Sequence, residues 1–216
     1  MTINILTIFP NYFDSLLKES IIKRAIEKNL VTINIFNIRD YAIDKHHVTD
    51  EKPFGGGAGM VMKVEPIFNA LKENNLKKET SKAKILLTSA KGKSFNQQIA
   101  NDYSQLDTLT IICGHYEGVD ERVVDNVIDE EIRIGDYVLT GGEPAANVIL
   151  DAVTRLLPGV LGNAESNKDE SHSTPGQLTH PQYTRPEKFN DWSVPKVLLS
   201  GDHQKIQDWR EENSTK

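Results

Sequence analysis

The 216-residue sequence contains a single cysteine, Cys113, and no long apolar run. One cysteine excludes an internal disulfide framework and a multi-cysteine zinc site, and it is typical of a reducing compartment. No apolar stretch reaches the roughly 18 residues that a membrane-spanning helix needs. Residues 1–10 also lack the basic start and the small-residue cleavage site of a signal peptide. We therefore expect a cytoplasmic protein that has no membrane segment.

Several catalytic signatures are missing as well. The six histidines show no HExxH or other close metal-binding spacing, which argues against a structural transition metal. No GxSxG sequence supports a serine nucleophile. Gly92-Lys93-Ser94 resembles the end of a P-loop, but Leu87 stands where its first glycine is required, and the run at 55–59 lacks the third glycine of GxGxxG. Neither loop therefore favours nucleotide-phosphate binding.

The formal net charge of −6 argues at first against a nucleic-acid partner. The acidity is local, however. Residues 102–136 hold ten acidic and two basic side chains, which leaves 23 basic and 21 acidic residues in the rest of the chain. A basic face elsewhere is therefore compatible with the sequence, and net charge does not decide the partner.

Strand-like and helix-like segments alternate along the first 157 residues. Their hydrophobic periods predict strands at 3–9, 31–37, 84–88, 108–113 and 131–134, and helices at 11–29, 64–74, 94–103, 119–128 and 143–157. This alternation predicts an α/β fold with a largely parallel sheet that is covered on both faces.

The last third of the chain has a different character. Residues 162–183 show no hydrophobic period, which is typical of a linker or a functional lid. An extended segment is expected at 196–200 and an amphipathic helix at 202–212. The sequence thus divides into a main domain, 1–161, a flexible linker, and a small C-terminal part, 184–216.

Glycines cluster where the predicted strands and loops end, at Gly55–Gly57, Gly59, Gly92, Gly114, Gly118, Gly135, Gly141 and Gly142. Such loops could cradle a ligand with main-chain groups, although tight turns are the alternative. Polar sequences follow two strands, at His115–Arg122 and Ile134–Glu143, and the carboxyl ends of strands are where ligands bind in open α/β sheets. A side chain at Gly141 or Gly142 is expected to fill ligand space or to force a disallowed φ.

Five motifs carry a resemblance to a known family. They are Pro53-Phe54-Gly55-Gly56-Gly57-Ala58-Gly59-Met60, Cys113-Gly114-His115-Tyr116-Glu117-Gly118-Val119-Asp120-Glu121-Arg122, Ile134-Gly135-Asp136-Tyr137-Val138-Leu139-Thr140-Gly141-Gly142-Glu143, Pro158-Gly159-Val160-Leu161-Gly162 and Pro181-Gln182-Tyr183-Thr184-Arg185-Pro186. In this order they resemble the bacterial tRNA (guanine-N1)-methyltransferases of the SPOUT superfamily over nearly the whole chain. The resemblance implies a SPOUT-type parallel sheet with a C-terminal trefoil knot. A linker and a partial, truncated helical tRNA-binding domain would follow it.

The resemblance also implies site residues. S-adenosylmethionine would lie in the knot, against Leu87, Ser89, Gly114, Tyr116, Ile134, Gly135, Tyr137, Leu139, Gly141 and Gly142. Glu117, Gly59 and Ser171 would bind the substrate, and a magnesium ion would act near Glu117. Arg155 would stabilise the charge at guanine O6. A linker carboxylate would remove the N1 proton, and here Glu170 occupies the usual aspartate position and follows Asp169, so both are candidates.

The resemblance implies a homodimer whose active sites combine residues of both chains, with tRNA as the substrate and guanine 37, beside the anticodon, as the target. Two alternatives stay open at this point. The chain could be another SPOUT methyltransferase that acts on a different RNA base, or a non-catalytic protein that binds S-adenosylmethionine or RNA.

Overall fold

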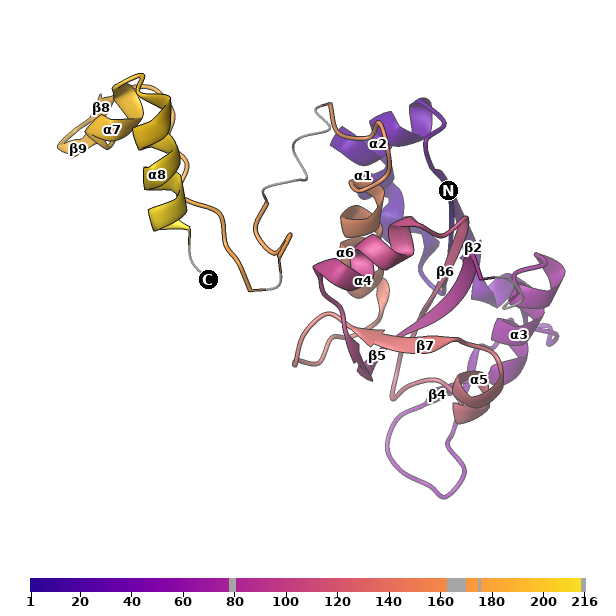
Figure 1. Cartoon of the computed structure of the whole chain (residues 1–216). Coiled ribbons are helices and arrows are strands. Elements are labelled where there is room, and N and C mark those ends of the chain that lie inside the picture. The colour runs from indigo at the N-terminus through magenta and orange to yellow at the C-terminus, as the bar shows by residue number, and fades with distance from the viewer. Residues whose placement is uncertain (78–80, 163–169, 175, 215–216) are drawn as a thin grey trace. The chain divides into compact units, whose positions relative to one another are not determined.

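The computed structural model describes residues 1–77, 81–162, 170–174 and 176–214. The chain forms two compact units, Met1–Gly162 and Asn163–Lys216 (Figure 1). The second unit contains both the expected linker, except Gly162, and the expected C-terminal part. The boundary between linker and C-terminal part at residue 183 remains a proposal.

The first unit alternates strands with α-helices and with the short 3-10 helices η1 and η2. Its elements are β1 (Thr2–Thr7), η1 (Pro10–Phe13), α1 (Asp14–Lys18), α2 (Ser20–Glu27), β2 (Thr32–Asn37), η2 (Ile38–Tyr41), β3 (Asp50–Glu51), β4 (Val61–Met62), α3 (Val64–Glu73), β5 (Ala83–Ser94), α4 (Gln97–Ser104), β6 (Thr108–Cys113), α5 (Glu121–Asn126), β7 (Glu130–Arg133) and α6 (Glu143–Thr154). Among the described residues, five strands form one parallel sheet in the order β2-β1-β6-β5-β7. The expected parallel α/β fold is thereby confirmed.

Helices cover both faces of this sheet because alternate side chains of each strand point in opposite directions. On β6, Leu109 and Ile111 are fully buried in a cluster that includes side chains of α2, α4 and α6. Ile112, which follows Ile111 and faces the other way, joins a second cluster with residues of α3 and α5. Figure 1 shows α4 and α6 on one side of the sheet and α3 and α5 on the other.

The helix expected at 11–29 is broken, and the continuous helix is therefore wrong. Glu19 is extended and Ser20 has a positive φ of 48°, so α1 ends and α2 begins there. A continuous helix with apolar residues every four positions from Phe13 would bury Ile21 and Ala25. After the break Ile22 is buried instead of Ile21, a shift of one residue, and Ala25 stays buried.

The helix expected at 94–103 also begins later than its hydrophobic pattern indicates. Ser94 is the last residue of β5, and α4 starts at Gln97 because Asn96 caps it. The Asn96 Oδ1 atom accepts a hydrogen bond from the Ile99 amide at 3.0 Å, which satisfies a backbone donor that the helix itself leaves unpaired.

The second unit contains a small hairpin and two helices. Its elements are β8 (Lys188–Phe189), β9 (Trp192–Ser193), α7 (Lys196–Leu199) and α8 (His203–Asn213). The extended segment expected at 196–200 is wrong, because Pro195 has the φ of a helix start and its carbonyl accepts from the Leu198 amide at 3.0 Å. In the described part of the chain, no helix combines the length and the apolar character required to cross a membrane.

Candidate active site

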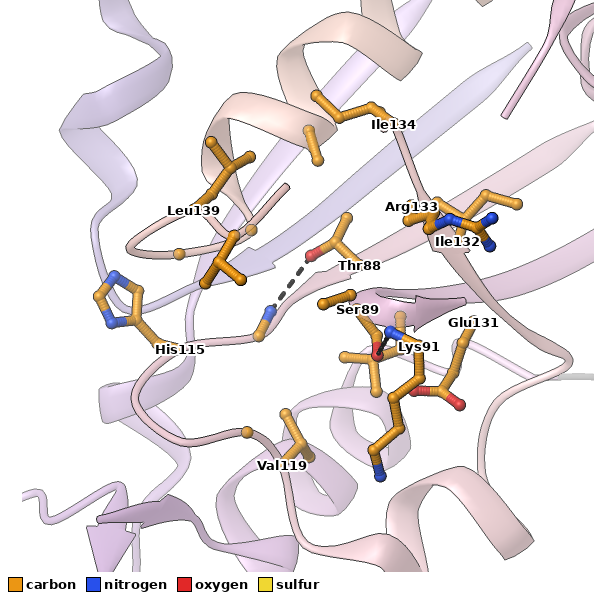
Figure 2. Close-up of a pocket in the computed structure, with 18 of the residues that line it drawn as sticks. Thr88, Ser89, Lys91, His115, Val119, Glu131, Ile132, Arg133, Ile134 and Leu139 are labelled. Atoms are coloured by element: carbon orange, nitrogen blue, oxygen red, sulfur yellow. Dashed lines mark hydrogen bonds between the residues drawn. The ribbon is translucent and has the colours of Figure 1, made fainter. Parts of the chain in front are cut away.

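A cavity of about 330 Å³ opens at the carboxyl ends of β5, β6 and β7, entirely within the first unit. Its walls come from the turn after residue 87 in β5, the turn at 114–119 after β6 and the segment 131–142 that includes the end of β7. The volume lies within the usual range of about 300–1,000 Å³ for small-molecule sites. In Figure 2, His115 and Leu139 lie on one side, and Lys91, Glu131 and Arg133 lie on the other.

Thr88 joins the ends of β5 and β6. Its hydroxyl donates to the Ile112 carbonyl at 3.2 Å and accepts from the Gly114 amide at 3.3 Å, the second contact being drawn in Figure 2. Beyond Thr88 the pairing of β5 with β7 is interrupted and resumes at Lys93. The residues between them form an irregular stretch of β5, and Ser89, Ala90 and Lys91 contribute one wall of the cavity.

The chain after β7 returns to the end of β6 before it enters α6. The Gly142 amide donates to the Gly114 carbonyl at 2.8 Å, and Gly141 forms an antiparallel bridge with His115. A Cβ atom at position 142 would overlap the Thr88 hydroxyl and would lie 2.9 Å from both Cys113 Cα and the Gly114 nitrogen. Position 142 therefore accepts only glycine without a backbone shift.

This geometry corrects one sequence-based expectation. Gly142 has a φ of −82°, which any residue can adopt, and Gly141 is not among the glycines with positive φ. A disallowed φ is thus the wrong reason for these glycines. The close approach of neighbouring chain segments is the physical one.

All ten residues expected to contact the methyl donor line this one cavity. They are Leu87, Ser89, Gly114, Tyr116, Ile134, Gly135, Tyr137, Leu139, Gly141 and Gly142. They come from three segments that are distant in sequence, and the sheet order brings these segments together. Their contacts with a ligand remain a prediction.

Glu117 and Gly59, two of the expected substrate-binding residues, lie next to each other. Glu117 is an exposed residue of the cavity wall, and its amide donates to the Met60 carbonyl at 3.0 Å. A Cβ atom at Gly59 would lie 2.6 Å from Glu117 Oε1. The glycine-rich loop 55–59 therefore reaches the edge of the cavity, as a substrate-binding role requires.

The expected catalytic residues are divided between the two units. Arg155 is the C-cap of α6 in the first unit. Glu170 and Ser171 belong to the second unit, where the Ser173 amide donates to the Glu170 carbonyl at 3.0 Å and the Thr179 amide donates to Ser171 Oγ at 3.1 Å. Asp169 lies outside the described residues.

Sequence reasoning missed several cavity residues, among them Thr88 and Lys91. The signal that could have found them is their place directly at the end of a predicted strand. Lys91 Nζ is paired with Glu121 Oε2 at 3.4 Å, and Arg133 Nε with Asp136 Oδ1 at 2.7 Å.

The electrostatic character of the cavity is acidic. Three glutamates line it, Glu117, Glu121 and Glu131, against two basic side chains, Lys91 and Arg133, and Lys91 is paired with Glu121 while Arg133 is paired with Asp136. Cys113 borders the site but is fully buried, and this burial, followed by the charge of Glu143, raises the pKa of its thiol well above the usual value. A neutral thiol is a poor nucleophile, so the cavity favours binding of a cationic ligand over thiol chemistry.

Comparison with known proteins identifies similar sequences over the whole chain. Residues 1–216 match the family model described as tRNA (Guanine-1)-methyltransferase TrmD. A tRNA (guanine-N(1)-)-methyltransferase of Dehalococcoides mccartyi is 54% identical over 99% of this chain and 86% of its own length. Proteins of the same name from Staphylococcus carnosus and Listeria monocytogenes are 52% and 47% identical, over 98% and 100% of this chain and 85% and 88% of their own lengths.

We predict that Gly142→Ala destabilises the first unit by about 1–3 kcal/mol, the usual cost of forcing an atom into a packed site. The matched control is Gly162→Ala, because a Cβ atom at position 162 would meet no other atom within 4 Å and the residue has no positive φ. Its effect should stay within about 0.5 kcal/mol. Urea unfolding of both variants measures the difference, and equal stabilities would contradict the close approach at Gly142.

Proposed function

The chain belongs to the tRNA (guanine-1)-methyltransferase TrmD family, and from this premise we propose that it transfers a methyl group from S-adenosylmethionine to N1 of guanine 37 in tRNA. The observation that carries the proposal is the cavity at the ends of β5, β6 and β7. It unites all ten residues expected to contact the methyl donor. Its acidic lining suits a ligand that carries a positive charge.

The residues present fit the methyl donor. Close backbone approach at Gly142 leaves main-chain groups of the strand ends along the cavity wall, where they can bind the adenosine and amino-acid parts of the ligand. When bound, S-adenosylmethionine supplies an electrophilic methyl group on a sulfonium. The lining glutamates favour this cation over a neutral ligand of the same shape.

The reaction needs two further groups, because guanine N1 carries a proton and negative charge develops at O6 as N1 attacks. We assign removal of the N1 proton to a carboxylate at position 169 or 170, which can also accept hydrogen bonds from the edge of the guanine. The Arg155 guanidinium stabilises O6. Glu117, Gly59 and Ser171 bind the substrate, the first two at the edge of the cavity.

A magnesium ion near Glu117 fits the structure less well. Among the described residues, no three histidine, cysteine or acidic side chains gather in a group that could hold a metal. We therefore assign no step of the reaction to magnesium.

The chain path supports a knotted arrangement in the region 88–154. The segment that enters α6 runs directly against the Thr88 side chain and the backbone at Cys113 and Gly114. We propose that this passage is the threading of a trefoil knot, and that the second unit contributes to binding of tRNA in the cytoplasm.

We propose a homodimer with shared active sites, and the length of α6 supports this proposal. Its twelve residues span about 18 Å at 1.5 Å per residue, with the cavity at its first end and Arg155 at its last. This span exceeds the reach of an arginine side chain, so one chain cannot place its own Arg155 at its own cavity. Tyr137, Val138 and Leu139, which are exposed beside the cavity, offer apolar surface for a second chain.

The activity is tested by incubating the protein with labelled S-adenosylmethionine and total tRNA lacking the modification. We expect label in 1-methylguanosine after digestion to nucleosides. Calorimetry with S-adenosylmethionine alone should show binding, because the cavity is formed without RNA. Label in another nucleoside would indicate a different RNA methyltransferase, and binding without any methylation would indicate a non-catalytic protein.

The linker base is identified by comparing Asp169→Asn, Glu170→Gln and the double variant in single-turnover methylation. Loss of about a hundredfold or more in only one single variant names the base, since this is the usual contribution of general-base catalysis. Glu187→Gln, which changes an exposed glutamate of the second unit, is the control and should keep full activity. Full activity in the double variant would remove both carboxylates from the mechanism.

Shared sites are tested with a mixed dimer of Arg155→Ala and Glu117→Ala chains that carry different purification tags. Each single-variant homodimer should lose about a hundredfold or more of the methylation rate, as is usual when a group that stabilises transition-state charge is removed. The mixed dimer contains one intact site, so it should recover about half of the wild-type activity under the two-fold symmetry of a dimer. A mixed dimer as inactive as its parents would contradict the shared site.

A further inference from the structure

Glu143 is a buried acidic residue that the proposed reaction does not use. It is the first residue of α6, and only 2% of its surface is exposed. The hydroxyl of Thr7, at the end of β1, donates to Glu143 Oε1 at 2.7 Å. Burying a carboxyl group costs free energy unless its oxygens have partners. We therefore ask which group lies next to the second oxygen, Oε2.

That second oxygen faces His115. Glu143 Oε2 lies 3.8 Å from His115 Nε2, and both groups crowd Gly141, where a Cβ atom would overlap the histidine ring and lie 2.6 Å from Glu143 Oε2. The carboxyl group therefore connects three segments: the end of β1, the turn after β6 and the start of α6.

His115 lies between Glu143 and the cavity, because its own side chain is part of the cavity wall. Its ring packs edge-on against Phe9 and Tyr116, with ring centroids 5.1 and 5.3 Å away. Tyr116 has a φ of 61°, in the left-handed region that is unfavourable for a residue with a side chain. Such a conformation persists only where the surroundings hold it.

We propose that Glu143 is a positioning residue for the methyl-donor site and acts through His115. Glu143 does not line the cavity, whereas His115, Tyr116 and Gly141 do. The carboxyl group fixes the imidazole ring, and the ring holds the Tyr116 turn against Gly141 at the separation that the ligand needs. The inference rests on the proposed function, because the ligand is S-adenosylmethionine.

The central test is the isosteric variant Glu143→Gln, which keeps the volume and an oxygen for Thr7 but changes the group that faces His115. We expect the dissociation constant of S-adenosylmethionine to rise about tenfold, which is about 1.4 kcal/mol of binding free energy. The constant for S-adenosylhomocysteine, the neutral thioether product, should rise by the same factor, because the wall changes shape for both ligands. At saturating donor, kcat should change less than about threefold, since the wall acts on binding.

Three further variants test the route from Thr7 and Glu143 through His115. His115→Phe keeps a ring beside Phe9 and Tyr116 but removes both ring nitrogens. Its loss of donor affinity should match that of Glu143→Gln. The double variant should bind no more weakly than either single one, since the two residues act as a unit. Thr7→Val, which removes the hydroxyl that holds the carboxyl group, should weaken binding in the same direction.

Ile149→Val changes a buried residue of the same helix and controls for a general loss of stability. It should lower the free energy of unfolding by about 0.5–1.5 kcal/mol and leave the donor affinity unchanged. If wild-type protein fails to bind the donor, the proposed function fails. If wild type binds and Glu143→Gln binds equally well, the positioning role is overturned. It is also overturned if only the sulfonium ligand loses affinity, which would mean a direct charge effect, or if the losses from Glu143 and His115 add.

Discussion

The close passage of the chain at Gly142 is the constraint on which the rest of the site depends. Here the backbone leading into α6 approaches the ends of β5 and β6 so closely that no side chain fits. The hydrogen bonds of Gly114 with Thr88 and with Gly142 hold the three segments together at this point. The cavity is the space left between the turns that the passage holds together, so fold and site share one packing arrangement.

Helix α6 makes that arrangement rigid. Ile149, Leu150 and Val153 are fully buried in the cluster that also contains the inward side chains of β1 and β6. Movement of the first turn of α6 would therefore cost buried apolar contact as well as hydrogen bonds. A site built on such elements is formed before its ligand arrives, which lowers the ordering cost of binding.

The sequence was sufficient for features that depend on local pattern. The strand at Thr108–Cys113 has the bounds that its β-rich run indicates, and the glycine-rich strand ends do line one cavity. Features that depend on distant contacts could not be predicted from it. Nothing near Glu19 signals the one-residue phase shift that buries Ile22, and Gly142 excludes a side chain because of residues 28 and 54 positions away in the sequence. The order of strands in the sheet is likewise a long-range property.

The two ends of α6 explain why a single chain is an incomplete enzyme under the proposed mechanism. Its first turn completes the donor cavity, whereas its last residues present Arg155 about 18 Å away along the helix axis. Methyl transfer requires the donor and the base to be in contact, and this separation is the reason for the proposal that Arg155 of a second chain stabilises guanine O6. In the proposed homodimer the same helix would serve two active sites: its start would shape the cavity of its own chain, and its end would complete the cavity of the partner.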